Sequence, residues 1–542
     1  MNWKNAPATR YEGHHGDRVV LCFADRPANV DQILRDTVAK HGGRDALIDG
    51  DRRYTFSELD KIAGSIAAGL AARGVAPGDR VALLLNNKAE FAFMLFGALR
   101  AGCVVVPLNT REQKPELEFV LGNCGAKVLV HEADLADRLP DANVPQLKFK
   151  FAVGGDAKGS EPFSALATDG AASKVDFDQE ATAVILYTSG TTGKPKGAML
   201  THMSMVMSAM HYESCWQLTK DDRALMAVPA THVTGLVAIL LTMVRAGGAT
   251  IILGAFKAAD FLALATKERM TYTLMVPAMY HLCLLQTKLD GYDLSAWRVG
   301  GYGGSPMPSA TIETLAKMLP NLNPCNCYGS TETTSPSTIV PLGDGTAHAH
   351  TVGLPVPCCE IRIMDDDGRE MAQGETGEVW IKGGHVAKGY WDNPDATRAN
   401  FISGFWKSGD IGALTKDGYL QIFDRKKDMI NRGGFKVYSA EVEDVLAYHP
   451  KVGEAAVVGD PDPVLSERVH AYILPKDKSV TVEDIKAYCA ARLSDYKVPD
   501  FVTFVDQPLP RNANGKVLKR ALKRDVVAGE GGGMAQSPKS VL

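Results

Sequence analysis

The sequence predicts an α/β protein with a large N-terminal domain of mainly parallel sheets covered by helices, a β-rich subdomain, and a small C-terminal α+β domain. Three observations predict this fold. Helical and strand-like segments alternate from about residue 30 to about residue 320. Short strands with Gly and Asp turns follow from about residue 351, and a charged, Gly-containing segment at 424–437 precedes about a hundred further residues. At 542 residues the chain is too long for a single core.

The alternation of helices and strands can be followed along the chain. The segment 55–74 has the period of a helix, with Thr55 placed to cap it and Glu58 three residues later, which is the pattern of a capping box. Further helices are predicted at 88–102, 202–216, 258–269 and 308–319. Short apolar runs predict strands at 79–85, 103–108, 181–187, 247–253 and 272–277.

The composition argues against several classes of protein. A net charge of −4, with no large basic excess, gives no support for a nucleic-acid partner. The apolar regions 91–108 and 236–253 are each interrupted by an arginine and by glycine, so we predict a buried helix and a buried strand in each, and no transmembrane segment. The ten cysteines lack the spacing of a zinc site and the N-terminus lacks a signal-peptide core, so we expect a cytoplasmic enzyme with reduced thiols.

The segment 187–197, "YTSGTTGKPKG", is the strongest local signal. It contains three Thr, one Ser, three Gly and two Lys, between a predicted strand and a predicted helix. Exposed backbone N–H groups, hydroxyls and ammonium groups together favour phosphate binding. The segment is not a Walker A loop, because Thr188 stands where that motif needs Gly and Pro195 stands where it needs Ser or Thr. A P-loop kinase is therefore disfavoured.

This segment is similar to the signature loop of adenylate-forming enzymes, the ANL superfamily of acyl-CoA synthetases, luciferases and peptide-synthetase adenylation domains. Further segments resemble that family's motifs and follow in its order, at 328–332, 377–391, 406–412, 423–437 and 510–516. The resemblance implies that a carboxylate attacks the α-phosphate of ATP and expels pyrophosphate. A thiol, usually that of coenzyme A, then attacks the acyl-adenylate and releases AMP. ATP, Mg²⁺ and CoA are the cofactor and substrates that it implies.

The resemblance also implies a nucleotide site. The loop would cradle the β- and γ-phosphates, Tyr328 would form a wall against adenine, Thr331 would contact the α-phosphate, and the carboxylate of Asp410 would accept hydrogen bonds from the ribose hydroxyls. Ser305 departs from the family, which usually has Ala there. The residues implied to bind ATP are Thr188, Ser189, Gly190, Thr191, Thr192, Lys196, Gly303, Gly304, Ser305, Tyr328, Gly329, Thr331, Asp410 and Arg425.

Three further residues are implied to be catalytic. Glu332 resembles the carboxylate that binds Mg²⁺, a hard ion that prefers oxygen ligands. Lys516 resembles the lysine that reaches the active site from the small domain and neutralises charge where two anions meet. His232 resembles the histidine at the mouth of the acyl pocket. Lys427 falls at the family's hinge, and Gly434 would line the pantetheine path of CoA, where a side chain would block it.

The expected domains follow from the same resemblance. Residues 1–426 would form the AMP- and acyl-binding domain, with the β-rich subdomain at about 351–426. Residues 427–527 would form the mobile lid, and the Gly-rich tail 528–542 is expected to be disordered. We expect the active site at the junction of the domains, with lid rotation about Lys427 withdrawing Lys516 before the second half-reaction.

The acid is predicted from the segment after His232, which is apolar over 233–244. An apolar acid is therefore expected, a fatty acid of medium to long chain, with an aryl acid as the alternative. Val233 and Thr234 stand where an amino-acid-activating domain has an Asp, which argues against that activity. The motifs leave a luciferase-like oxidation open.

The alternative from another class is a non-catalytic regulator that binds AMP or an acyl-adenylate. The presence of Lys516, Glu332 and the intact loop disfavours it. No motif gives the oligomeric state, and a homodimer is one alternative.

Overall fold

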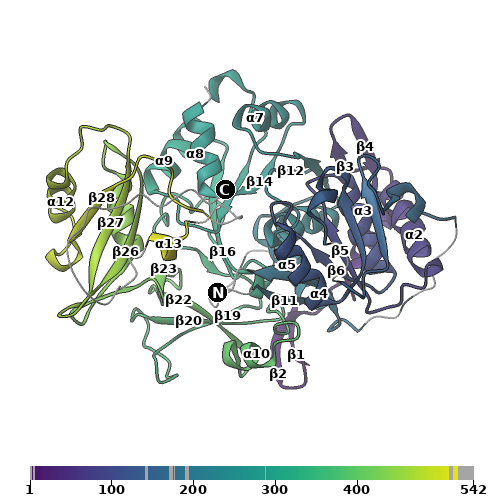
Figure 1. Cartoon of the computed structure of the whole chain (residues 1–542), viewed down its shortest axis with the longest axis horizontal. Helices are drawn as coiled ribbons and strands as arrows, with labels where there is room; N and C mark the ends of the chain where they lie inside the picture. Colours follow the sequence, from purple (N-terminus) through teal and green to yellow (C-terminus); the bar gives the residue numbers. More distant parts are fainter. Residues whose placement is uncertain are drawn as a thin grey trace. The chain divides into compact units, whose positions relative to one another are not determined.

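The computed structural model describes residues 3, 6–140, 144–169, 175, 178–188, 195–286, 289–511 and 517–522. Contacts divide the chain into two compact units, Met1–Ile422 and Phe423–Leu542 (Figure 1). The division falls inside strand β23 (Leu420–Arg425), whereas the sequence places the boundary after residue 426. Each unit has a hydrophobic core of its own.

Two large sheets organise the first unit. Both are mainly parallel, as predicted, with antiparallel pairs at their edges. In sheet order, the seven-stranded sheet comprises β11 (Lys196–Thr201), β10 (Thr182–Thr188), β6 (Val104–Pro107), β5 (Arg80–Leu84), β7 (Ala126–Glu132), β8 (Phe149–Val153) and β9 (Glu161–Pro162). The nine-stranded sheet comprises β18 (Leu354–Pro355), β17 (Thr338–Ile339), β16 (Asn323–Tyr328), β15 (Val299–Gly303), β14 (Tyr272–Met275), β12 (Arg223–Met226), β13 (Ala249–Ile252), β3 (Asp45–Asp49) and β4 (Arg52–Thr55).

Helices cover both faces of each sheet (Figure 1). Alternate residues of β5 face opposite cores: Val81 and Leu83 pack toward the nine-stranded sheet, and Ala82 and Leu84 pack on the outer face. The helices between the sheets are α1 (Val30–His41), α2 (Phe56–Ala72), α3 (Ala89–Arg100), α5 (His202–Cys215) and α6 (Thr242–Ala246). The outer helices are α4 (Lys114–Cys124) on the first sheet and α7 (Ala258–Lys267), α8 (Pro277–Gln286) and α9 (Ser309–Met318) on the second.

Local sequence signals account for several of these elements. The predicted capping box of α2 is confirmed, because the Thr55 hydroxyl accepts the Glu58 N–H and the Glu58 carboxylate accepts the Thr55 N–H. The apolar region 236–253 forms part of a π-helix, then α6 and β13, and the region 91–108 forms most of α3 and β6. In the part of the chain that the structure describes, no helix has the length and hydropathy needed to cross a membrane.

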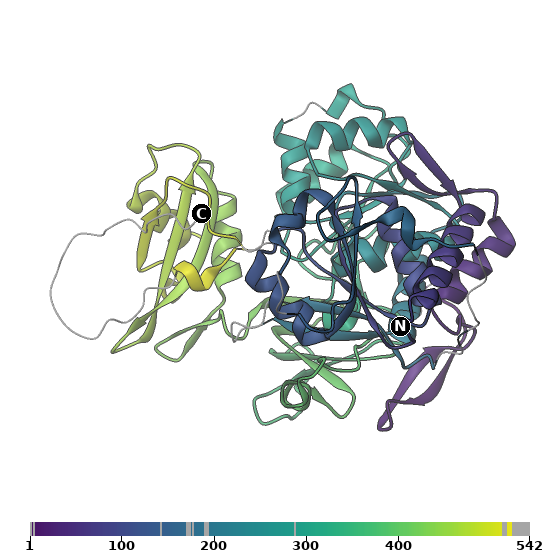
Figure 2. The ribbon, with the colours of Figure 1, turned by 45° about the vertical axis from the view of Figure 1, so that its right-hand side comes forward.

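Two smaller sheets complete the first unit. The β-rich subdomain is antiparallel and contains β19 (Glu360–Met364), β20 (Gly377–Lys382), β22 (Phe405–Leu414), β21 (Phe401–Ile402) and the start of β23. A separate two-stranded ribbon, β1 (Thr9–His14) and β2 (Arg18–Phe23), is drawn in purple in Figure 2. The sequence did not predict this ribbon, because β1 buries one residue of six and so lacks an apolar alternation.

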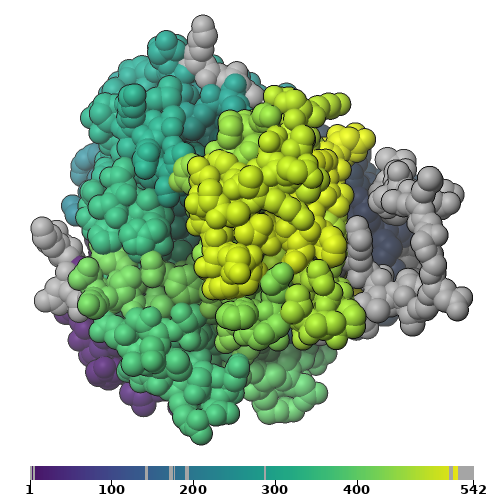
Figure 3. All heavy atoms as spheres, turned by 90° about the vertical axis from the view of Figure 1, so that its left-hand side faces the viewer, coloured from purple at the N-terminus to yellow at the C-terminus, as the bar shows by residue number. Residues whose placement is uncertain are grey.

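The second unit is a small α+β domain, as predicted. Its sheet contains β25 (Phe435–Val437), β24 (Ile430–Arg432), β27 (Ser466–Pro475), β26 (Val452–Asp462) and β28 (Phe501–Phe504). Its helices are α11 (Ser439–Ala447), α12 (Val482–Ala490) and α13 (Lys519–Leu522). Aliphatic side chains of the sheet, α11 and α12 form its core, and its heavy atoms, yellow-green to yellow in Figure 3, form one packed body.

Candidate active site

The Gly-rich segment begins and ends on a β-hairpin. Antiparallel pairing places Thr188, at the end of β10, opposite Lys196, at the start of β11. The Thr188 hydroxyl donates a hydrogen bond to the Lys196 carbonyl at 3.4 Å. The strand before the segment and the helix that begins at His202 are confirmed, but β11 between them was not predicted. The predicted contacts Ser189, Gly190, Thr191 and Thr192 lie outside the described residues.

Glu332 lies on a short 3₁₀ turn, Thr331–Thr333, shortly after β16. The residue is 8% exposed. Its Oε1 accepts a hydrogen bond from the Tyr390 hydroxyl at 2.9 Å, and its Oε2 accepts one from the Ser330 hydroxyl at 2.6 Å. Among the described residues, no lysine or arginine forms an ion pair with this carboxylate. The described residues therefore offer this buried carboxylate no charge compensation, and the arrangement fits a hard cation.

Tyr390 connects Glu332 to the end of the Gly-rich segment. The Nζ atom of Lys196 lies 5.3 Å from the centroid of the Tyr390 ring, within the range of a cation–π contact. The next residue, Trp391, donates its backbone N–H to the Gly197 carbonyl at 2.7 Å. Burial and the nearby Glu332 carboxylate raise the pKa of Tyr390. Its hydroxyl therefore stays protonated at neutral pH and donates to Glu332.

A second pair of predicted residues meets at the end of β16. The hydroxyl of Tyr328 donates a hydrogen bond to Oδ2 of Asp410 at 2.7 Å. Asp410 is 8% exposed, and its N–H donates to the Ser408 hydroxyl at 3.0 Å. The structure therefore brings together the two residues that the sequence predicts at adenine and at ribose, although β16 and β22 belong to different sheets.

Two of the predicted glycines, Gly303 and Gly304, are required by their local geometry. A Cβ on Gly303 would lie 2.3 Å from the carbonyl oxygen of Cys327 on the neighbouring strand. Gly304 has a φ of +80°, which favours glycine. Ser305 is exposed and Thr331 is half-buried next to Glu332. Because Gly304 and Ser305 are exposed, a ligand can approach the backbone at these two residues.

His232 comes just before the π-helix η3 (Thr234–Leu241), whose side chains lie in the core between the two sheets. The turn before His232 is held by Asn87, which follows β5. The Asn87 amide donates to the Val228 carbonyl at 2.9 Å and accepts the Ala230 N–H at 2.7 Å. One buried amide therefore joins the two large sheets beside His232.

The remaining predicted residues belong to the second unit. Arg425 ends β23 and is exposed, and Lys427 is exposed in the turn that follows. Gly434 has a φ of +90° between β24 and β25, so an L-amino acid there would be strained. Lys516 lies outside the described residues. The roles of these residues stay predictions.

Tyr390, Ser330 and Asn87 were missed by the reasoning from sequence. Tyr390 and Ser330 stand inside the segments 377–391 and 328–332, so their places in those motifs were the available signal. Asn87 had no such signal, because its partners lie 141 and 143 residues along the chain. Its role becomes visible only in the folded structure.

Comparison with known proteins follows the same division of the chain. Residues 34–391 match the family model of the AMP-binding enzyme, and residues 441–516 match that of the AMP-binding enzyme C-terminal domain. The long-chain-fatty-acid–CoA ligase FadD13 of Mycobacterium tuberculosis is 35% identical, over 88% of this chain and 94% of that protein. The feruloyl-CoA synthase of Amycolatopsis sp is 34% identical, over 90% of this chain and 95% of that protein.

A solved structure of a CoA ligase is also similar to this chain. o-Succinylbenzoate CoA synthetase (MenE) from Bacillus subtilis, in complex with ATP and a magnesium ion, has a TM-score of 0.80 at 31% identity, over 90% of this chain and 98% of that chain. The fold is that of adenylate-forming enzymes, as the resemblance implies. The chain belongs to the AMP-binding enzyme family and, within it, to the AMP-forming acid–CoA ligases.

Proposed function

We propose that the protein is an ATP-dependent acyl-CoA ligase that activates an apolar carboxylic acid, a fatty acid of medium to long chain. The single observation that carries this proposal is the setting of Glu332, a buried carboxylate that accepts hydrogen bonds only from hydroxyl groups among the described residues, close to the base of the Gly-rich segment. The ATP and magnesium ion in the structure of MenE support the same assignment here.

In the first half-reaction, Thr188 and Lys196 would bind phosphate oxygens of ATP, with Lys196 supplying positive charge. Glu332 would hold Mg²⁺, which neutralises charge on the phosphates. Tyr328 and Asp410 would bind adenine and ribose, and their mutual hydrogen bond holds both side chains in place before the nucleotide arrives. A carboxylate oxygen of the acid then bonds to the α-phosphorus, and the bond from that phosphorus to the bridging oxygen of pyrophosphate breaks.

In the second half-reaction, the CoA thiol loses its proton and its sulfur bonds to the acyl carbon. The bond from this carbon to the adenylate oxygen breaks, so AMP leaves with one oxygen of the original acid. Lys516 would serve the first step only, and rotation about Lys427 would remove it. The Gly434 backbone would then line the path of the pantetheine chain.

The class of acid has two candidates. The π-helix beside His232 is apolar and buried, which supports a fatty acyl chain. An aryl acid is supported by a different observation: the buried rings of Tyr212, Trp216 and Tyr272 pack together behind β15, and a Cβ on Gly301 would lie 2.9 Å from Trp216. Such packing limits the depth open to a long chain and favours a compact acid. The feruloyl-CoA synthase relative agrees with this alternative.

Release of pyrophosphate from ATP tests the proposal. Saturated acids from acetate to palmitate, and benzoate and ferulate, are each added with and without CoA. We expect pyrophosphate release that depends on the acid and is greatest with fatty acids of medium to long chain. With CoA present, release should continue over many turnovers. A preference for ferulate or benzoate would replace the fatty acid by the aryl alternative. No acid-dependent release would favour a non-catalytic regulator.

The cytoplasmic location and the homodimer stay predictions from the sequence. Light scattering of the purified protein measures its mass in solution directly. A mass of about twice 58.2 kDa supports the homodimer, and a mass near 58.2 kDa excludes it under those conditions.

A further inference from the structure

The β1–β2 ribbon precedes residues 34–391, which match the family model, and no motif assigns it a role. Its side chains make polar contacts with two segments of the first unit. One is 387–388, just before Tyr390. The other contains Glu180, just before β10 and the Gly-rich segment. The ribbon therefore contacts both segments that lead into the candidate phosphate site.

Arg18, at the start of β2, makes the first contact. Its two terminal nitrogens donate to the carbonyls of Ala387 and Lys388, each at 3.0 Å, and its guanidinium lies 5.6 Å from the centroid of the Phe401 ring. Burial lowers the pKa of Arg18, but a guanidinium remains charged at neutral pH. Two charge-assisted hydrogen bonds from one planar group fix the orientation of two consecutive peptide groups.

The preceding peptide group, between Val386 and Ala387, contacts Glu332. The N–H of Ala387 donates to the backbone carbonyl of Glu332 at 2.8 Å. Three residues further on, the Tyr390 hydroxyl donates to the Glu332 carboxylate. Arg18 therefore holds a segment that contacts both the main chain and the side chain of Glu332.

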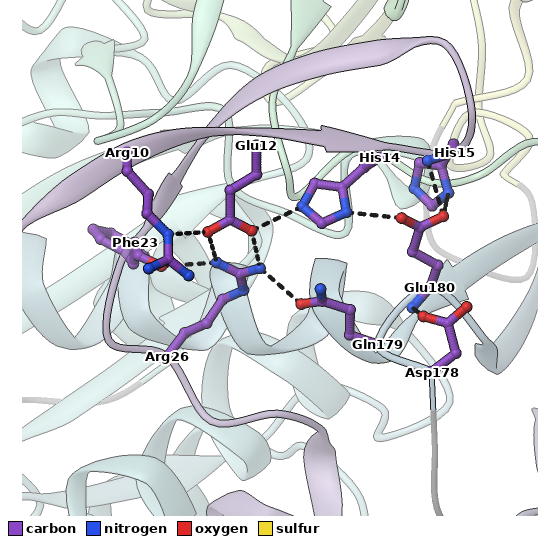
Figure 4. Close-up of polar contacts among 9 residues, drawn as sticks. All are labelled: Arg10, Glu12, His14, His15, Phe23, Arg26, Asp178, Gln179 and Glu180. Atoms are coloured by element: carbon purple, nitrogen blue, oxygen red, sulfur yellow. Dashed lines mark hydrogen bonds and ion pairs between the residues drawn. The ribbon is translucent and has the colours of Figure 1, made fainter.

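The second contact is a network of charged groups around His14 (Figure 4). The two ring nitrogens of His14 lie 3.1 Å from Glu12 and 2.8 Å from Glu180. The N–H of His15 also donates to Glu180, at 2.8 Å. Arg26 binds both carboxylate oxygens of Glu12 and lowers the pKa of Glu12 to about 2, so this anchor keeps its charge at neutral pH.

A metal ion is the other use that this cluster suggests, since Glu12, His14 and Cys22 present ligand atoms within 4.8 Å of one another. Two observations disfavour it. Arg26 already occupies both oxygens of Glu12 with its positive charge. Burial raises the pKa of the Cys22 thiol to about 11, which disfavours the thiolate that a metal needs. The cluster is therefore an anchor for the ribbon.

We propose that the β1–β2 ribbon positions the phosphate and Mg²⁺ site, with Arg18 as the positioning residue. The ribbon joins the segment that enters β10 to the segment that carries Tyr390, and so fixes Glu332 relative to the base of the Gly-rich segment. This inference rests on the proposed function, which gives Glu332 its Mg²⁺. It adds a role for residues that precede those matched by the family model.

Arg18→Gln in the full chain tests the proposal, with Val19→Thr as the matched control. Val19 is the next residue of β2, and it is 60% exposed, so the control keeps the ribbon and changes a side chain that faces solvent. Without nucleotide, we expect faster amide hydrogen exchange at 385–391 in Arg18→Gln. We also expect the Mg²⁺ concentration for half-maximal ATP binding, measured by calorimetry, to rise about tenfold, because two hydrogen bonds from a charged group are lost. Val19→Thr should change neither.

Two further variants separate the possible failures. Arg18→Lys keeps the charge but cannot make both hydrogen bonds in the same geometry, so we expect an intermediate change in amide exchange and in Mg²⁺ dependence. This variant also replaces Arg18→Gln if Arg18→Gln does not fold. Unchanged exchange and unchanged Mg²⁺ dependence in the folded Arg18 variant overturn the positioning role. If Glu332→Gln also leaves the Mg²⁺ dependence unchanged, the role of Glu332 in the proposed function is wrong instead.

Discussion

Replacing Lys516 with alanine is expected to lower acyl-adenylate formation at least about 100-fold, the loss typical for removing one charge-stabilising group from an active site. The physical reason is that a carboxylate and a triphosphate are both anions, and the ammonium group would reduce their repulsion where the new bond forms. Acid-dependent exchange of labelled pyrophosphate into ATP measures this half-reaction alone.

The second half-reaction gives Lys516→Ala an internal control. When acyl-adenylate is supplied directly, thioester formation with CoA should continue at nearly the original rate, because Lys516 would serve only the first step. Lys478→Ala is the matched control, since Lys478 is an exposed lysine of the same unit. Undiminished exchange in Lys516→Ala would mean that the proposed catalytic role of this lysine is wrong.

Glu332→Gln is expected to lower adenylate formation about 100-fold or more and to raise the Mg²⁺ requirement. Glutamine has nearly the size of glutamate, and its amide oxygen can still accept one of the hydrogen bonds from Tyr390 and Ser330. What is lost is the negative charge that would hold the cation. Exchange of pyrophosphate at several Mg²⁺ concentrations measures both effects.

The thermal stability of Glu332→Gln separates a functional from a structural role. Since the carboxylate is buried and its described partners are neutral, removing its charge should leave Tm unchanged or raise it. Glu313→Gln, an exposed position on α9, is the matched control and should change neither activity nor Tm. A Glu332→Gln protein that loses stability but keeps its Mg²⁺ dependence contradicts the assignment.

Much of the fold of the first unit could be predicted because its signals are local. The capping box of α2, the apolar strands and the ends of elements at glycine each depend on a few neighbouring residues. The first strand of the β1–β2 ribbon lacked such a signal, because most of its side chains face solvent or form ion pairs. The apolar run of β2 was a local signal, but it was not recognised as a strand. The π-helix η3 was missed as well: its apolar run is compatible with any buried helix, and its hydrogen bonds do not follow from residue type.

The candidate site was predictable to the extent that it consists of motifs. Glu332, Tyr328 and Asp410 were named from their segments, and the structure adds that Tyr328 and Asp410 share a hydrogen bond. The partners that hold the site were not predictable in the same way. Arg18 contacts residues 369 and 370 positions away, and Tyr390 contacts Glu332 58 positions away, so their pairing appears only when the chain has folded.

The measurement that tests the central claim most directly uses an acid labelled with ¹⁸O in its carboxylate, together with ATP and CoA. If the carboxylate attacks the α-phosphate, one labelled oxygen must appear in AMP, and pyrophosphate must remain unlabelled. Mass spectrometry of the two products decides the result. Labelled inorganic phosphate with formation of ADP would indicate an acyl phosphate, and it would contradict activation of the acid through an adenylate.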